Sequence, residues 1–287
     1  MLNYIDAFAA VAESGSISLA ARRLGVAQPA ISRQMKMLES AIGTPLLDRD
    51  HDGIQLTPAG MKLRDHVVPW LRDLDALRNV LQGEEGGGVI RFGSLTEAGQ
   101  AFFMPRLLRY RMIRQDVDLK ILYAKEHELR GAFDRGDLDV IITTAEVKGK
   151  GVACDVLQTE RSFLVARSAF RSQINSAAEF RYSRFVAYRD DDPLLNAYVS
   201  KHYPKVTLDQ LNIAISVNSH RSMIDALMTM DAVAVMPQQS IHDSLQAKLL
   251  HVVSKRELQG RLYISTRQTF SDSRLGRTFL DHLSAAE

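Results

Sequence analysis

Four polar side chains that could read DNA bases lie between residues 28 and 36. A glutamine can pair with adenine through two hydrogen bonds and an arginine with guanine, while serine and lysine can contact bases or phosphates. The four residues are Gln28, Ser32, Arg33 and Lys36. The window around them, residues 14–38, holds four basic residues and no acidic residue. This clustering, which the overall charge of +2 hides, predicts a nucleic-acid-binding face.

A helix-turn-helix is the element that would present this face. Residues 3–14 have apolar side chains three and four apart, which predicts a first helix. A second short helix over 18–24 follows, opened by Ser16 or Ser18, and Gly25 supplies the turn after it. Pro29 suits the first position of a third helix, because its missing N–H would be unpaired there anyway.

Small and apolar side chains should hold the second and third helices together. Ala20 and Ala21 permit close approach, and Leu24, Val26 and Ile31 are the expected apolar anchors. A purely structural three-helix unit would explain this spacing equally well. It would not explain why the acid-free window coincides with the exposed face, so the pattern favours DNA binding.

A hairpin and a long helix should follow. The apolar segments 45–47 and 54–56 predict two short strands, and Thr57 and Pro58 begin a helix that extends to about residue 82. A strict heptad seam, typical of a helix that pairs with another helix, follows its length: Leu63, Val67, Trp70, Leu74, Leu77 and Leu81. An amphipathic helix lying on its own domain is the alternative. Pro69 should kink this helix or split it near Val68.

The charged and glycine-rich segment 84–88 predicts a linker, after which strands and helices alternate. That alternation predicts an α/β domain with a mostly parallel sheet and flanking helices. The expected strands are 89–95, 117–123, 138–143, 161–166, 185–188, 211–217, 232–236 and 261–267. The expected helices are 98–114, 126–135, 193–202, 219–230 and 273–285.

The 287 residues, 46% of them hydrophobic, suit about two globular domains. No apolar stretch approaches the roughly 18 residues of a membrane span, and the single cysteine, Cys154, forms no disulfide within the chain, so a cytoplasmic protein is expected. We expect no metal and no cofactor, because Asp190, Asp191 and Asp192 are typical of a solvated loop without nearby His or Cys. The common nucleotide-binding, protease and hydrolase motifs are absent, so we expect no enzyme activity.

Residues 1–60 closely resemble the N-terminal domain of LysR-type transcriptional regulators. The resemblance rests on three segments, which together are more specific than a generic helix-turn-helix: Phe8–Ser16, Ala20–Gln34 and Leu38–Gly60. It is looser over residues 89–287, where it rests on the order of elements and on short signatures such as 136–140 and 234–237. The resemblance implies a bacterial transcription factor that binds double-stranded DNA and is controlled by a small-molecule co-inducer.

The resemblance also implies an architecture. A winged helix-turn-helix (residues 1–60) and a dimerising linker helix (58–85) would precede an effector domain like a periplasmic binding protein (89–287). That domain would have two subdomains, about 89–161 with 267–287 and about 162–266, joined by crossover strands at 161–167 and 261–267. The protein would be a homodimer through the linker helix and, more often, a homotetramer.

Carried onto this chain, the resemblance places the DNA contacts at Gln28, Pro29, Ser32, Arg33 and Lys36 on the recognition helix and at Arg49 on the wing. Ala27 is a departure, because the family usually has Ser or Thr there. A hydroxyl cap is therefore lost, which costs about 0.5–2 kcal/mol where such a cap forms.

The resemblance places the effector cleft at the ends of strands and the beginnings of helices. The matching positions are Ser94, Thr96, His127, Thr144, Asn218 and Ser219. Each could equally be an ordinary cap or turn residue. Residues 89–287 carry 27 basic and 23 acidic residues, a slight bias that fits an acidic effector without requiring one. The alternative is a DNA-binding regulator whose C-terminal domain only oligomerises and senses no ligand.

Overall fold

The computed structural model describes residues 2–50, 53–82, 87–170 and 173–284. Its first three helices form the predicted helix-turn-helix unit: α1 (Leu2–Ser14), α2 (Ile17–Leu24) and α3 (Gln28–Ile42). Ser16 caps α2 by accepting a hydrogen bond from the Leu19 N–H, and Gly25 ends it in the left-handed conformation with φ 66°. Because only glycine adopts this conformation without strain, Gly25 sets the turn into α3.

The core of this unit confirms one predicted anchor and corrects two. Ile31 is fully buried, as expected, together with Ala20 and Ala21 of α2. Leu24 and Val26 are 38% and 42% exposed, so they do not anchor the unit. They lie on either side of the Gly25 turn, where the chain reverses away from the core, and Ile17 supplies the missing contact from α2.

The predicted hairpin is present, formed by β1 (Leu47–Asp50) and β2 (Gly53–Leu56) in antiparallel register with Leu47 opposite Leu56. Helix α4 (Pro58–Gln82) follows and runs without interruption through Pro69. The split expected near Val68 is therefore not observed. Val67 and Val68 are both buried and the Pro69 ring lies against Gly136, so packing on both sides holds the helix across the missing N–H.

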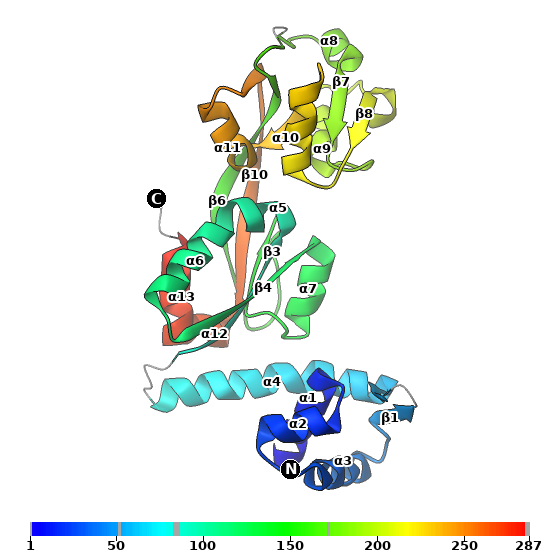
Figure 1. The fold of residues 1–287 in the computed structure, drawn as a ribbon, viewed down its shortest axis with the longest axis vertical. Helices are drawn as coiled ribbons and strands as arrows, with labels where there is room; N and C mark the ends of the chain where they lie inside the picture. The colour runs from blue at the N-terminus through cyan, green and yellow to red at the C-terminus, as the bar shows by residue number, and fades with distance from the viewer. Residues whose placement is uncertain (1, 51–52, 83–86, 171–172, 285–287) are drawn as a thin grey trace.

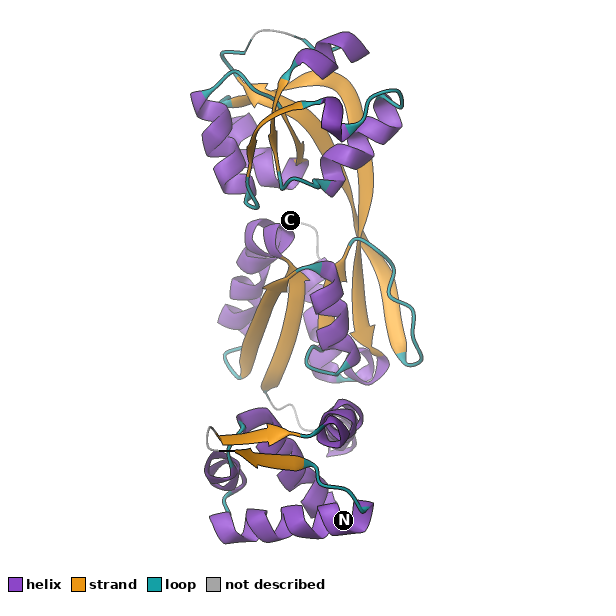
Figure 2. Ribbon diagram, turned by 90° about the vertical axis from the view of Figure 1, so that its right-hand side faces the viewer, coloured by secondary structure: helices purple, strands orange, loops and turns teal. Residues whose placement is uncertain are grey.

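The apolar seam of α4 divides between the chain's own core and solvent. Leu63 packs on the helix-turn-helix core, and Val67 is 9% exposed. Trp70 is 47% exposed. The side chains of Leu77 and Leu81 lie outside the described residues. Figure 1 shows α4 crossing the molecule between the helix-turn-helix and the α/β region, and Figure 2 shows the same stack of parts turned by 90°.

The α/β region consists of two units that share two long strands. The six-stranded sheet has the order β4 (Val117–Ala124), β3 (Gly88–Leu95), β5 (Val140–Thr143), β10 (Leu250–Arg267), β6 (Val152–Arg167) and β9 (Ala234–Pro237). A separate parallel pair is formed by β7 (Arg184–Ala187) and β8 (Asn212–Ser216). The shared strands are β6 (Val152–Arg167) and β10 (Leu250–Arg267), which pair antiparallel from Val152 opposite Arg267 to Arg167 opposite Leu250. They pass through both units in Figure 1.

The unit next to α4 has a parallel β4-β3-β5 core flanked by helices. Its core packs Ile90, Phe92 and Phe103 against Phe279, and the rings of Phe92 and Phe103 lie 5.6 Å apart. Its elements, besides the shared strands, are β3 (Gly88–Leu95), α5 (Thr96–Ala98), the π-helical η1 (Gly99–Phe103), α6 (Met104–Ile113), β4 (Val117–Ala124), α7 (Glu126–Asp134), β5 (Val140–Thr143), α12 (Gln268–Asp272) and α13 (Arg274–Ser284).

The far unit is built around Phe180, Phe185 and Tyr198, all fully buried. Its elements are α8 (Ala177–Tyr182), β7 (Arg184–Ala187), α9 (Pro193–His202), the 3-10 helix η2 (Leu208–Gln210), β8 (Asn212–Ser216), α10 (His220–Thr229), β9 (Ala234–Pro237) and α11 (Gln238–Gln246).

Every strand and helix predicted between residues 89 and 285 has a counterpart. Three α-helices, α8, α11 and α12, and the short 3-10 helix η2 were not predicted. Both crossover strands are much longer than expected, with β6 starting at Val152 and β10 at Leu250. Within the described ranges, no helix is long and apolar enough to cross a membrane.

Candidate functional site

Helix α3 presents an exposed basic face. Gln28, Pro29, Arg33 and Lys36 are exposed and Ser32 is half-buried, while Ile31, Met35 and Leu38 point into the core. Among the described residues, Arg33 and Lys36 have no hydrogen-bond or ion-pair partner. Two cationic side chains are thus held on a rigid helix with their charges uncompensated.

The start of α3 lacks a side-chain cap. Ala27 occupies the N-cap position with extended backbone, and no side chain bonds the first turn. Gln28 is the first residue of the helix and Pro29 the second, one position later than expected. The Gln28 side chain accepts a hydrogen bond from the Ser18 hydroxyl at 3.1 Å, which ties the recognition face to α2. For Arg49, only the backbone is described: it pairs with Ile54 in the hairpin.

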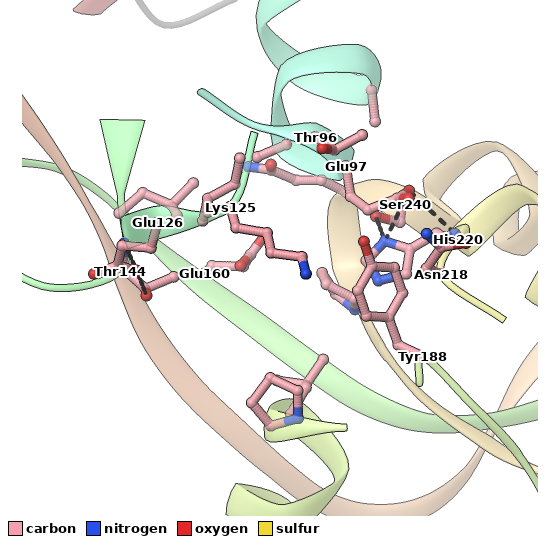
Figure 3. Close-up of a pocket in the computed structure, with 18 of the residues that line it drawn as sticks. Thr96, Glu97, Lys125, Glu126, Thr144, Glu160, Tyr188, Asn218, His220 and Ser240 are labelled. Atoms are coloured by element: carbon pink, nitrogen blue, oxygen red, sulfur yellow. Dashed lines mark hydrogen bonds and ion pairs between the residues drawn. The ribbon is translucent and has the colours of Figure 1, made fainter. Parts of the chain in front are cut away.

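A pocket of about 490 Å³ opens between the two α/β units (Figure 3). Helices α5, α7, α9 and α10 point their first residues at it, and β6 forms part of its wall. Its apolar lining comes from Leu95, Ala98, Ala101, Ala124, Pro193, Leu194, Pro237 and Leu262.

The structure places three of the six predicted effector residues on this pocket: Thr96, Thr144 and Asn218. The other three do not line it. Ser94 is fully buried and donates to the Leu95 carbonyl oxygen, His127 is exposed on α7, and the Ser219 hydroxyl accepts from the Ser222 N–H as the cap of α10.

Glu97 and His220 connect the two units across the pocket. The Glu97 carboxylate accepts a hydrogen bond from the His220 N–H at 3.1 Å, and its Oε2 lies 3.5 Å from His220 Nδ1. Burial raises the pKa of Glu97 and lowers the pKa of the His220 imidazole to about 4. His220 is therefore neutral at pH 7, and its Nδ1 lies 2.8 Å from the Ser240 hydroxyl.

Glu160 and Gln239 are two acceptors of this pocket that have no partner among the described residues. Glu160 reaches it from β6, and burial raises the pKa of its carboxyl to about 7. The Oε1 atom of Gln239 is buried and accepts no hydrogen bond from any described residue. A buried acceptor without a donor costs about 1–3 kcal/mol, so Gln239 Oε1 favours a ligand that donates to it, and the ionised Glu160 carboxylate accepts from the same kind of ligand.

Asp192 corrects the expectation of a solvated loop at residues 190–192. It is 2% exposed and caps α9, accepting hydrogen bonds from the N–H groups of Tyr188, Leu194 and Leu195. Among the described residues, no group of three or more His, Cys, Asp or Glu side chains could hold a metal ion.

Several pocket residues could not be identified from the sequence alone. Glu160 lies in a strand segment that carries no turn or cap signal, and Gln239 belongs to a helix that was not predicted. His220 directly follows the predicted Ser219 cap, so its place at a helix start could have been found. The positively charged Lys125, directly before α7, could have been found from the same position at a helix start.

Comparison with known proteins identifies the class of protein that this architecture represents. Residues 2–61 match the family described as "Bacterial regulatory helix-turn-helix protein, lysR family". Residues 83–287 match the family described as "LysR substrate binding domain". The chain therefore belongs to the LysR family of bacterial regulatory proteins.

Relatives with curated names are regulators. The small neutral protease regulatory protein of Streptomyces coelicolor is 36% identical over 110 residues, which are 38% of this chain and 34% of that protein. CbbR of Rhodospirillum rubrum is 34% identical over 145 residues, 49% of this chain and 48% of that protein. The match thus spans a third to a half of these relatives. ClcR of Pseudomonas putida is 27% identical over 234 residues, 77% of each chain.

Solved structures of regulators share the fold over nearly the whole chain. A full-length OxyR variant from Pseudomonas aeruginosa has a TM-score of 0.77 at 18% identity and covers 100% of this chain and 98% of its own. ArgP of Mycobacterium tuberculosis has a TM-score of 0.73 at 21% identity, covering 98% and 95%. LysG of Corynebacterium glutamicum, solved with bound effector Arg, has a TM-score of 0.69 at 17% identity, covering 98% and 95%.

Proposed function

We propose that this protein is a sequence-specific, DNA-binding transcriptional regulator whose activity is controlled by a small molecule bound between its two α/β units. The observation that carries the proposal is the exposed face of α3, where Arg33 and Lys36 are uncompensated by any described residue. A recognition helix of this kind enters the major groove and reads base edges with its N-terminal side chains. Gln28, Pro29, Ser32, Arg33 and Lys36 are the proposed contacts on α3, with Arg49 on the wing.

The proposed division of the chain follows from these elements. Residues 1–60 bind DNA, 58–85 form the linker helix, and 89–287 bind the effector. Thr96, Thr144 and Asn218 are the proposed effector contacts among the predicted residues, because they line the pocket. The bound Arg reported for LysG supports a ligand in this type of domain.

We also infer that two chains pair through α4, and that two such dimers form a tetramer. The half-exposed Trp70 supports this, because a large aromatic side chain left open on a long helix is typical of a surface that another helix covers. Paired recognition helices would then contact two half-sites of one operator.

The contacts of α4 suggest how the effector region acts on DNA binding. Pro69 lies against Gly136, in the turn between α7 and β5, and α4 also packs on α12. Helix α12 directly follows the crossover strand β10. A change of angle between the two α/β units would therefore be transmitted to α4, and it would change the spacing of the recognition helices.

Selection from random DNA tests the proposal. The purified protein is incubated with a pool of random duplexes, and the bound fraction is amplified and sequenced over several rounds at about 150 mM salt, near physiological ionic strength. We expect enrichment of one motif with dyad symmetry, since paired recognition helices read symmetric half-sites. A pool that stays random, with retention that only falls as salt rises, would show that binding goes through phosphates alone.

A further inference from the structure

At two of the helix N-termini that line the effector pocket, carboxylates of the chain itself already accept the helix N–H groups. Glu97 accepts from the first N–H of α10, and Asp192 accepts from two N–H groups at the start of α9. Helix N-termini attract anions because their N–H groups are unpaired. At α9 and α10 the place of an external anion is therefore taken by side chains of the protein itself.

The charges that line the pocket are also mainly negative. Its lining includes four carboxylates: Glu97, Glu126, Glu160 and Asp192. The basic side chains are Lys125 and Arg189, and Arg189 already pairs with Asp191, with 3.3 Å between Nε and Oδ1. Neutral His220 adds no positive charge. The slight basic bias of residues 89–287 therefore does not extend to the pocket.

Two acceptors of the pocket are left without partners among the described residues. The Glu160 carboxylate has no hydrogen-bond or ion-pair partner in the described part of the chain, and Gln239 Oε1 is buried there without a donor. Figure 3 shows Glu160 entering from one wall, with Glu97, Tyr188 and His220 grouped on the opposite side. A ligand that donates several hydrogen bonds would satisfy both the ionised Glu160 carboxylate and Gln239 Oε1, whereas a fully ionised dicarboxylate has no donor for either.

We propose that the effector carries a positively charged nitrogen, as an amine, a guanidine or a basic amino acid does, and that Glu160 and Gln239 bind that nitrogen. The cationic side chain of Lys125 can pair with one carboxylate on the same ligand molecule. This inference rests on the proposed function, since it names the chemical class of ligand for the same pocket.

The titration of Glu160 makes this assignment sensitive to pH. The free protein holds this carboxyl with a pKa of about 7, so it is largely protonated at pH 6 and largely ionised at pH 8. A cation binds the ionised form, so binding must release the proton at low pH. Affinity should therefore rise about tenfold between pH 6 and pH 8. The charged and titratable groups facing Glu160 across the pocket are Glu97, Lys125, Glu126, Tyr188, Arg189, Asp192 and His220. His220, with a pKa of about 4, does not titrate in this range.

A matched panel of compounds tests the charge assignment on the full-length protein. The cationic probes are L-lysine, L-arginine, cadaverine and agmatine, and the anionic probes are glutarate, adipate, pimelate and citrate. Thermal shift at pH 8 screens all eight, and calorimetry at pH 6 and pH 8 measures each hit. We expect stabilisation by at least one cation and by no anion, with the pH dependence given above.

Two variants connect the result to the pocket. Glu160→Gln keeps the shape of the side chain and should weaken cation binding about tenfold or more at pH 8, because a charge-assisted hydrogen bond is lost. It should also abolish the pH dependence. The matched control is Glu146→Gln. Glu146 is an exposed carboxylate that does not line the pocket, so its replacement should leave both the affinity for the cation and its pH dependence unchanged.

The outcomes separate this inference from the proposed function. Stabilisation by the dicarboxylates alone, or cation binding that is unaltered in Glu160→Gln, overturns the cationic effector but leaves a ligand-responsive regulator standing. If none of the eight probes binds while the protein still selects a symmetric DNA motif, the cationic effector is overturned, and the result favours the alternative in which the C-terminal region only oligomerises.

Discussion

Replacement of Arg33 by alanine is expected to weaken specific operator binding by roughly 1–3 kcal/mol, about 5- to 150-fold. Arg33 is exposed on α3 and pairs with no described residue, so its guanidinium is available to a base edge. An arginine that reads guanine through two hydrogen bonds accounts for discrimination of this size. Fluorescence anisotropy on the selected duplex and on a scrambled duplex measures the effect.

Arg181→Ala is the matched control for Arg33→Ala. Arg181 is also exposed and lies on α8 of the far α/β unit, away from the helix-turn-helix (Figure 1). Its replacement removes the same charge and should leave operator affinity within about twofold. Sedimentation should show both variants in the assembly state of the unaltered protein. Equal affinity for the operator in Arg33→Ala would show that α3 is not the recognition helix.

Replacement of Ile31 by alanine is expected to cost the helix-turn-helix unit about 2–5 kcal/mol of stability. Ile31 is fully buried in the core that α3 shares with α1 and α2, so its truncation leaves a cavity. A unit of roughly 60 residues has only a small reserve of stability. We therefore expect operator binding to be lost because the unit unfolds, although no side chain that contacts DNA has changed.

A graded series separates this effect from the loss of a DNA contact. Ile31→Val removes one methylene and should cost only about 0.5–1.5 kcal/mol, with operator binding retained. Differential scanning calorimetry should show a lowered transition in Ile31→Ala and an unchanged one in Arg33→Ala. Operator binding by Ile31→Ala at full strength, with unaltered melting, would contradict the described core.

The helix-turn-helix was largely predictable because local signals agree there. Ser16 and Gly25 mark the ends of α2, and the spacing of Ile31, Met35 and Leu38 identifies the buried face of α3. The side chains on the opposite side of α3 then form its exposed basic face. The two wrong anchors, Leu24 and Val26, show the limit of this reasoning, since apolar type alone does not say whether a residue beside a turn reaches the core.

The length of the crossover strands could not be predicted for a physical reason. The segments of β6 and β10 that pair between the units consist of partly exposed and exposed residues, because no helix layer covers them there. Without a continuous apolar run, such a strand looks like a loop in the sequence. Its partner lies far along the chain, as Glu160 opposite Gly260 shows, so only long-range pairing defines it.

The pocket shows what the order of elements predicts and what it leaves open. Placing polar residues at strand ends and helix starts identified Thr96, Thr144 and Asn218 as residues near a cleft, and the structure places them on the pocket. The same rule suggested anion binding at the helix starts. It could not foresee that Glu97, from the neighbouring unit, accepts from the start of α10.

A footprint of the purified protein on the DNA upstream of its own coding region tests the central claim most directly. A regulator with recognition helices paired through α4 should protect two neighbouring sites, each with dyad symmetry. Protection should survive near-physiological salt, about 150 mM, and disappear in Arg33→Ala at the same protein concentration. Diffuse protection that falls steeply with salt and is equal in Arg33→Ala would contradict the claim that α3 reads a specific sequence.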